Sequence, residues 1–466
     1  FTVLIMYLTK FIENLFKRFL PSPFIIAVIL TFTTIIIAVV FSNFVDSKSS
    51  LSFFEILSSW ERGVWNKDLL VFAYQMILIL VLGNILVLSP PVSKVILTIA
   101  KYATSTQKAV VIVSFSVMLV AFFNWGLGLI FGAILARKIG DYSAENNIKL
   151  NYPLVGAAGY VGLMVWHSGI SGSAPIKVAE DNHLLNLMSS RQDSYLYEDL
   201  PVSLNFDLTV LSNANLITFV VLLVLVPLTF YFLSKNTQDH NNILKNPIKN
   251  QYLTSRIKSN GLEGSRLFSI AFGMILLTAF FYQYFDQLIN FKITPNSLNF
   301  FMLGLSILLH SNFKSFLTAL QESINGASGI LIQFPLYFGI MGIMKESGLI
   351  IYISDFFISI SNEFTLPIFT FFSAAIINIF VPSGGGQWVI QGPVVIAAAT
   401  ELNVPIQKVV MALAYGDQLT NMLQPFWALP LLAITKLKAK EILPYTLIIM
   451  LVGLVVFISS LIIFKF

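Results

Sequence analysis

The longest apolar runs of this chain exceed the length of a membrane span. About 18 to 20 apolar residues cross the hydrocarbon core as a helix, and many runs reach that length, for example 24–41, 216–233 and 442–464. They do not alternate apolar with polar residues as barrel strands do. Only 11% of the 466 residues are charged, against about 25% in a soluble domain. We therefore expect an all-α polytopic membrane protein. The chain has no cysteine, which excludes disulfides and thiolate metal sites.

Positive charges indicate the topology, because Lys and Arg favour the cytoplasmic side. The first residues, 1–19, read as an amphipathic surface helix, and their basic residues predict a cytoplasmic N-terminus in the inner (cytoplasmic) membrane. The basic loop 234–266 is predicted to be cytoplasmic and the acidic loop 177–212 external. Nine spans are expected, near 22–42, 69–89, 152–178, 212–233, 267–285, 297–311, 326–345, 405–434 and 442–464. This scheme holds only if 109–139 and 366–401 each enter and leave on one side, as re-entrant hairpins.

The two halves of the chain resemble each other. The stretch 157–175 aligns with 412–430, matching Tyr160 with Tyr415 and Pro175 with Pro430, both 255 residues apart. Upstream, Asn124 falls on Asn378 at an offset of 254 and Gln75 on Gln333 at 258. Under the predicted topology the halves have opposite orientations. The sequence therefore predicts an inverted repeat, a plan common among secondary transporters.

Glycines interrupt the two predicted hairpins. The run "VPSGGGQWVIQGP" (381–393) breaks the second, and "NWGLG" (124–128) breaks the first. Irregular backbone survives at membrane depth only when it faces protein or a water-filled cavity. We expect each hairpin to turn near the midplane and to present N–H groups at the start of its second arm, where anions bind.

The span after each hairpin is also interrupted, at 165–175 and 416–430. The prediction is that four breaks converge on one polar pocket at mid-depth. The alternative is close helix packing through small residues. That alternative explains scattered glycines such as Gly156, Gly159 and Gly162 better than it explains three consecutive glycines.

Asp417 is the acidic residue placed near mid-depth, where carboxylates usually mark ion or proton pathways. It is a candidate Na⁺ ligand or proton carrier, unless it faces water at the end of its span. His167 is a candidate proton carrier, or a neutral ring bonded to a carbonyl. Ion coupling is assigned to Asp417, Asn378, Asn421 and His167. Substrate binding is assigned to Asn124, Trp125, Gly126, Ser168, Ser171, Ser383, Gly384, Gly385, Gly386, Gln387, Trp388 and Gln424. For the polar members the alternative is hydrogen bonding between helices, and for the aromatic ones ordinary packing.

The sequence shows no nucleotide-binding motif and no His/Glu zinc pattern, and it gives no sign of nucleic-acid binding or of an enzyme. No cofactor is expected beyond Na⁺ as a candidate ion. No Lys or Arg is placed near the pocket, so dipoles and one cation suit a single carboxylate. A short alkyl tail would gain about 0.8 kcal/mol per buried CH₂.

Several motifs resemble the short-chain fatty acid transporter family: "VPSGGGQWVIQGP", "AYGDQ" (414–418), "QPFWALP" (424–430), "NWGLGL" (124–129) and "ILIQFPLYFGIM" (330–341). The resemblance implies a carrier of monocarboxylates such as butyrate or acetoacetate. The family is similar to the ion-transporter superfamily, which implies a homodimer with an elevator motion. In the short-chain fatty acid transporter family the stretch matching 167–170 is mostly glycine, whereas this chain has His167 and Ser168. This difference leaves the identity of the coupling ion open.

By that likeness the chain divides into four parts. Scaffold elements are expected over 1–108 and, with a cytoplasmic linker, over 234–345; the moving halves are expected over 109–233 and 346–466. The function expected is secondary active transport of short-chain monocarboxylates coupled to Na⁺ or H⁺. The alternatives are a Na⁺/H⁺ antiporter and a fatty-acid channel or sensor.

Overall fold

The protein is helical throughout the part of the chain that the structure describes. The computed structural model describes residues 11–12, 14–16, 18–44, 51–188, 200–236, 261–289, 294–310, 312–324 and 328–465, and no strand occurs among them. Six helices in these ranges are long and apolar enough to cross a membrane. They are α2 (Pro23–Phe44), α4 (Lys67–Leu88), α6 (Thr106–Phe123), α11 (Asn213–Asn236), α12 (Arg266–Ile289) and α21 (Ala439–Ile463). The expected all-α, multi-pass architecture is confirmed.

Five of these helices match predicted spans, but two other predicted spans differ in length or shape. The span expected over 297–311 is α13 (Pro295–Leu309), whose 15 residues cover only about 22 Å. The span expected over 326–345 is α15 (Ser328–Glu346), and it continues into α16 (Leu349–Ser359) after a bend of 58°. Gly348 lies at this bend with φ 75°, in the left-handed region that favours glycine.

The first arm of the first predicted hairpin is longer than expected. Helix α6 begins at Thr106, and its 18 residues extend about 27 Å, close to the thickness of the hydrocarbon core. Ser105 explains the early start, because its side chain caps the helix by accepting the Lys108 N–H. The first arm of the second predicted hairpin, α17 (Leu366–Phe380), has only 15 residues. Its length therefore fits an arm that ends inside the hydrocarbon core better than the length of α6 does.

The short helices that were not predicted include α3 (Phe53–Val64), α5 (Pro90–Ala100) and α14 (Phe313–Ile324). The start of α3 has a readable signal, since Ser52 and Glu55 form a capping box. The amphipathic helix predicted over 1–19 falls partly outside the described residues, although those described between 11 and 19 are helical. Most of the basic loop 234–266 and part of the acidic loop 177–212 also lie outside them.

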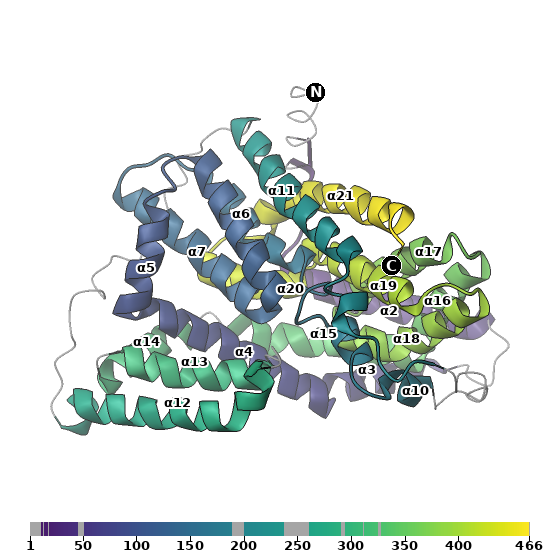
Figure 1. The fold of residues 1–466 in the computed structure, drawn as a ribbon, viewed down its shortest axis with the longest axis horizontal. Coiled ribbons are helices and arrows are strands. Elements are labelled where there is room, and N and C mark those ends of the chain that lie inside the picture. The colour runs from purple at the N-terminus through teal and green to yellow at the C-terminus, as the bar shows by residue number, and fades with distance from the viewer. Residues whose placement is uncertain are drawn as a thin grey trace.

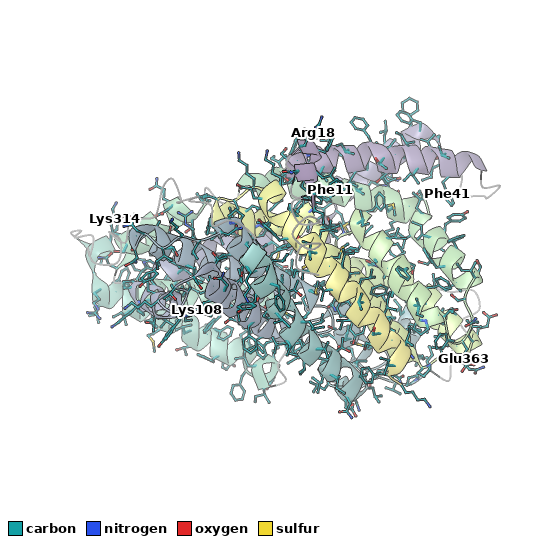
Figure 2. All side chains as sticks on the ribbon, turned by 90° about the horizontal axis from the view of Figure 1, so that it is seen from above. Phe11, Arg18, Phe41, Lys108, Lys314 and Glu363 are labelled. Atoms are coloured by element: carbon teal, nitrogen blue, oxygen red, sulfur yellow. The ribbon has the colours of Figure 1, made fainter. Side chains whose placement is uncertain are left out.

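The helices pack in two groups (Figure 1). In one, α15 packs on α2, α3 and α4, while α13 packs on α4 and α12. The other contains α6, α7 (Trp125–Glu145), α8 (Tyr152–Tyr160), α11 and α21, together with α17, α18 (Gly384–Glu401), α19 (Ile406–Thr420) and α20 (Pro425–Thr435). Helices α7 and α20 contact α4 and α15 across the boundary. Figure 2 shows α2 along one edge, with Arg18 beside one end and Phe41 near the other.

Glycines allow the closest helix crossing of the first group. A Cβ on Gly342 of α15 would overlap the carbonyl oxygen of Ser59 on α3, and one on Gly63 would overlap that of Phe338. The same crossing holds an ion pair between Arg62 and Glu346. Small residues therefore bring two backbones into contact here, as in other membrane proteins.

We predict that Gly342→Ala destabilises the protein by about 1–3 kcal/mol, because the added methyl group forces α3 and α15 apart. The measurement is the thermal unfolding temperature in detergent. Gly329→Ala in the same helix is the control, since its Cβ would meet only side chains, Gln333 Nε2 at 3.3 Å and Leu429 Cδ2 at 3.9 Å. Equal unfolding temperatures for the two variants would contradict the prediction.

Candidate functional site

Two helix breaks carry the same local structure. Helix α6 ends at Asn124, whose extended backbone has φ −148° and whose Oδ1 accepts the Leu127 N–H at 2.9 Å. Helix α17 ends near Val381, and Ser383 then has φ −150° and accepts the Gly386 N–H at 3.2 Å. Asn124 and Ser383 are thus the N-caps of the second arms, α7 and α18. They lie 259 residues apart, so the caps do not follow the offset of 254 that pairs Asn124 with Asn378.

The three glycines occupy the first turn of α18, as predicted for the start of a second arm. Gly386 donates to its cap, whereas the N–H groups of Gly384 and Gly385 meet no acceptor in the described ranges. In the first hairpin the Trp125 N–H donates to Ser171 Oγ at 2.9 Å, and the Gly126 N–H has no described acceptor. Unpaired N–H groups at a helix start carry partial positive charge and attract anions.

The two remaining breaks interrupt the spans after the hairpins. Helix α8 passes into a 3₁₀ turn (Val161–Met164), and an irregular segment then leads to α9 (Ser173–Val178). Helix α19 passes into another 3₁₀ turn (Asn421–Leu423), and α20 begins at Pro425. Both spans therefore break where the polar and glycine-rich stretches predicted it.

All four breaks contact one another through the first broken span. Ile170 N–H donates to the Phe122 carbonyl at 2.8 Å, which joins this span to the first hairpin. A Cβ on Gly384 would lie 2.7 Å from His167 Cε1, so the second tip packs directly on the same segment. The Tyr160 hydroxyl donates to the carbonyls of Asn421 and Gln424, which joins the two broken spans. The four breaks therefore contact one another as expected, whereas their place at mid-depth and the polar pocket between them remain predictions.

A buried histidine and carboxylate form the centre of the site. Both side chains are fully buried, with His167 Nδ1 2.6 Å from Asp417 Oδ2. The Ala174 N–H donates to His167 Nε2 at 3.0 Å, so that nitrogen carries no proton. The neutral ring must then hold its proton on Nδ1 and donate it to Asp417. Asp417 accepts through Oδ2, and the pair bears one negative charge when the Asp417 carboxyl is ionised.

Gln418 fixes the segment that carries His167. Its Oε1 accepts the backbone N–H groups of His167 and Ser168, both at 3.0 Å, and its Nε2 donates to Ser168 Oγ at 3.1 Å. Asn215 of α11 donates to the Ser168 carbonyl and accepts from the Tyr415 hydroxyl. Sequence reasoning missed Asn215. The available signal was a pair of amides, Asn213 and Asn215, at the start of an apolar span.

Asn378 and Gln424 join the second hairpin to the second broken span. Asn378 Nδ2 lies 2.8 Å from the Asp417 carbonyl and 2.9 Å from both Thr420 Oγ1 and Asn421 Oδ1. Gln424 Nε2 donates to the Asn378 carbonyl at 2.6 Å. The two amides thus form hydrogen bonds between helices, which is the alternative to ligand binding that the sequence left open for the polar residues.

Oxygen atoms without protein partners point to a cation. Asp417 Oδ1 and Asn378 Oδ1 are buried and have no hydrogen-bond partner within the described residues. Carboxylate and amide oxygens beside unwound backbone are the ligands that transporters use for Na⁺. The described residues contain no group of three or more His, Asp or Glu suited to a metal. A cation here would therefore depend on Asp417 with amide and carbonyl oxygens.

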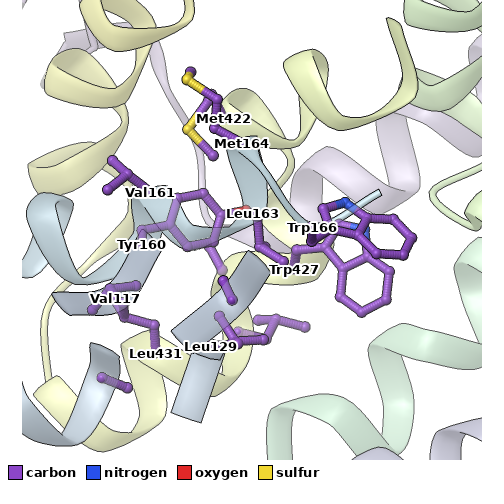
Figure 3. Close-up of a cluster of buried hydrophobic side chains, with 14 of the residues drawn as sticks. Val117, Leu129, Tyr160, Val161, Leu163, Met164, Trp166, Met422, Trp427 and Leu431 are labelled. Carbon is purple, nitrogen blue, oxygen red and sulfur yellow. The ribbon is translucent and has the colours of Figure 1, made fainter. Parts of the chain in front are cut away.

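Aromatic rings form an apolar wall beside the tips. The Trp125 ring lies 5.7 Å from Trp166 and 5.2 Å from Trp427, and Phe72 of α4 lies 6.1 Å from Trp427. Figure 3 shows Trp166 and Trp427 at the edge of the buried cluster that contains Tyr160 and Met164. Trp166 was not among the predicted residues, although it adjoins His167.

Two predicted residues are turned away from the tips. Gln387 donates to the Ala374 carbonyl and to Gln391, both within the second hairpin. Trp388 is fully buried, and its Nε1 donates to His183 of α10 (His183–Met188) at 3.0 Å. Their predicted roles in substrate binding remain untested, but neither side chain lies with the other candidates.

The fold and site define a polytopic, all-helical membrane protein whose helix breaks enclose a buried polar site. The family model for short-chain fatty acid transporters matches residues 4–464. Two bacterial proteins provisionally designated short-chain fatty acid transporters are each 35% identical to it. The Escherichia coli K12 protein aligns over 98% of this chain and 99% of its own, and the Haemophilus influenzae Rd protein over 94% and 95%. The chain belongs to the short-chain fatty acid transporter family. A transporter family accords with the expectation that the chain is not an enzyme.

Two solved transporters show a distant likeness. MtrF of Neisseria gonorrhoeae, of a class of antimetabolite efflux pumps, is 13% identical with a TM-score of 0.41, covering 96% of each chain. The YdaH transporter of Alcanivorax borkumensis is 11% identical with a TM-score of 0.43, covering 94% of this chain and 97% of its own.

We predict that Gly384→Ala abolishes most transport, because its Cβ would lie 2.7 Å from His167 Cε1 and 2.8 Å from Trp166 Cη2. Gly385→Ala is the matched control, since its Cβ would meet Ser173 Oγ at an ordinary 3.6 Å. Substrate uptake by purified protein in liposomes compares the two. Equal activity would show that the second tip does not pack on His167 as described.

Proposed function

We propose that the protein is a secondary active carrier of short-chain monocarboxylates such as butyrate or acetoacetate, coupled to Na⁺ or H⁺. The observation that carries the proposal is the pair of unpaired N–H groups of Gly384 and Gly385, beside a buried carboxylate with one unpaired oxygen. The N–H groups suit the substrate's carboxylate. The unpaired oxygen suits the coupling cation.

Charge balance favours co-transport over uptake of the anion alone. The His167–Asp417 pair already carries one negative charge, and a bound carboxylate adds a second within the same buried region. Two like charges at low dielectric repel strongly. A cation at Asp417 Oδ1 removes this repulsion. Binding of the ion therefore promotes binding of the substrate, which is the coupling that a symporter needs.

The aromatic wall supports a short apolar tail on the substrate. Trp125, Trp166 and Trp427 give the site an apolar side, and each methylene buried there adds about 0.8 kcal/mol. A three- or four-carbon acid would gain about 2–3 kcal/mol over the bare headgroup. This supports monocarboxylates with short chains.

The remaining parts of the proposal rest on the family resemblance. The helices near α6–α11 and α17–α21 would move as one body against α2–α4 and α12–α15, in an elevator motion within a homodimer. The two halves would form an inverted repeat, with the N-terminus on the cytoplasmic side of the inner membrane. The similar element order of the halves, with a capped break followed by a 3₁₀ break in each, supports this reading.

The test of transport is uptake of labelled butyrate into liposomes that contain the protein. Neutral fatty acids cross bilayers unaided, so the assay runs at alkaline pH and uses counterflow, with empty liposomes as the control. A Na⁺ or H⁺ gradient should drive accumulation, and external butyrate should exchange with internal label. Ion flux without any acid would favour the antiporter, and flux that neither saturates nor exchanges would favour a channel.

We predict that Asp417→Asn removes the ion dependence of uptake and lowers the rate at least tenfold. The amide retains an oxygen for His167 but loses the charge that holds the cation. Glu401→Gln, an exposed acid at the end of α18, is the control. Uptake by Asp417→Asn that still follows the ion gradient would exclude Asp417 from coupling.

A further inference from the structure

A small cavity with several charged side chains in its lining lies away from the helix breaks. Its volume is about 70 Å³, and it sits between helices of the two groups. Helix α4 contributes Asn84, α7 contributes Arg137 and Lys138, and α14 contributes Glu322. Ser323 of α14 and Lys436, the residue that ends α20, complete the polar lining. Apolar side chains such as Leu80 and Ile134 fill the rest.

The cavity has an excess of positive charge in a buried place. Arg137 and Lys138 are only 4% and 5% exposed. Arg137 pairs with Asp141 at 3.0 Å, but Lys138 makes no ion pair within the described part of the chain. Glu322 is the one acidic residue in the lining and is half-buried. Three cations therefore face one lining carboxylate, with Asp141 already engaged by Arg137.

The cavity lies at the far end of the helices that form the site. Along α7, Lys138 is about 20 Å from Trp125, and along α20 Lys436 is about 16 Å from Pro425. Along α4, Asn84 is about 18 Å from Phe72. Trp125, Phe72 and the Trp427 ring that follows Pro425 belong to the aromatic wall. One seam between the two groups thus joins the aromatic wall to the cationic cavity.

The position of Lys436 indicates the side of the membrane. The segment that contains Lys436, Lys438 and Lys440 is predicted to be cytoplasmic. The cavity would then be the cytoplasmic end of the seam. A buried lysine without a partner is costly, and a small anion beside it removes that cost. A cavity of this size admits a small carboxylate headgroup but not a large one.

We infer that this cavity, lined by Arg137, Lys138 and Lys436, is a second binding site for the substrate's carboxylate, at the cytoplasmic end of the path. The inference rests on the proposed function. It assigns the two sites different chemistry: backbone N–H groups hold the anion at the helix breaks, and fixed cations hold it at the cavity. The cationic cavity concentrates the anion at one face of the protein. It does not neutralise the Asp417 carboxylate, which therefore still needs the coupling ion.

A competing role for the same residues is a latch between the two groups. Lys138 on α7 and Glu322 on α14 have opposite charges and lie on opposite sides of the seam. A latch requires a close ion pair, and none forms between them in this structure. The unequal charge of the lining also favours an anion over a balanced pair.

The experiment measures butyrate KM at each face, using counterflow in vesicles of both orientations. Lys138→Met should raise KM at the predicted cytoplasmic face about tenfold, the usual effect of losing a hydrogen bond to a charged group, and should leave the opposite face within twofold. Lys149→Gln, an exposed lysine after α7, is the control. The thermal unfolding temperature checks that each variant folds. An unchanged KM at the cytoplasmic face in a folded variant overturns the site.

Glu322 separates the two roles. For an anion site, Glu322→Gln lowers KM at that face or leaves it unchanged, and the exchanged pair Lys138→Glu with Glu322→Lys stays impaired. For a latch, Glu322→Gln behaves like Lys138→Met, and the exchanged pair recovers. The latch outcome overturns the inference.

Direct binding distinguishes failure of the inference from failure of the proposed function. Scintillation proximity with labelled butyrate reports binding to purified protein even if no gradient drives transport. In the Gly384→Ala background the remaining butyrate binding should disappear when Lys138→Met is added. Binding that persists in the double variant contradicts the cavity. If butyrate binding depends on Lys138 but no gradient drives transport, the proposed function is contradicted and the binding site in the cavity is not.

Discussion

The interior of this protein is organised around one buried carboxylate. Asp417 is fully buried. Because a buried carboxylate is costly, its neighbours must donate hydrogen bonds to it or at least not add a further negative charge. His167 does the first, because the Ala174 N–H forces its proton onto the nitrogen that faces Asp417. The irregular backbone around this pair is tolerable only because the other breaks and the amides of Gln418 and Asn215 satisfy it. The polar centre and the helix breaks therefore require each other.

In the proposed mechanism, the substrate's negative charge is handled differently at the centre and at the edge of the molecule. At the centre the chain offers only peptide dipoles and a negatively charged pair, so an anion alone is poorly held there. Near the end of α7 it offers fixed cations instead. This division is reasonable for a carrier, because a lysine at the centre would bind the anion without the coupling ion. The rings of Phe72, Trp125 and Trp427 contact one another at the central end of the helices that also line the cavity.

The places where helices break were largely predictable from sequence, because glycine, proline and capping residues act locally. Asn124 and Ser383 cap the second arms within the stretches that glycines marked, and Asn421 begins the expected second break. The partners across the site were not predictable. Gln418 and Asn215 bond to residues about 250 and 47 positions away, and no periodicity records such pairs. The sequence also did not predict that Trp388 points toward His183. A tryptophan can be buried on either face of a helix, so its burial does not show which face it lies on.

The separation of His167 and Asp417 along the chain has a consequence for biosynthesis. The two residues are 250 positions apart, and ribosomes add about 5–20 residues per second. The segment around His167 therefore waits on the order of 10–50 s for its partner. During that interval its peptide groups lack the partners that Gln418 supplies in the folded protein. The first broken span is thus made early, but its polar backbone is satisfied only after residues 417 and 418 have been made.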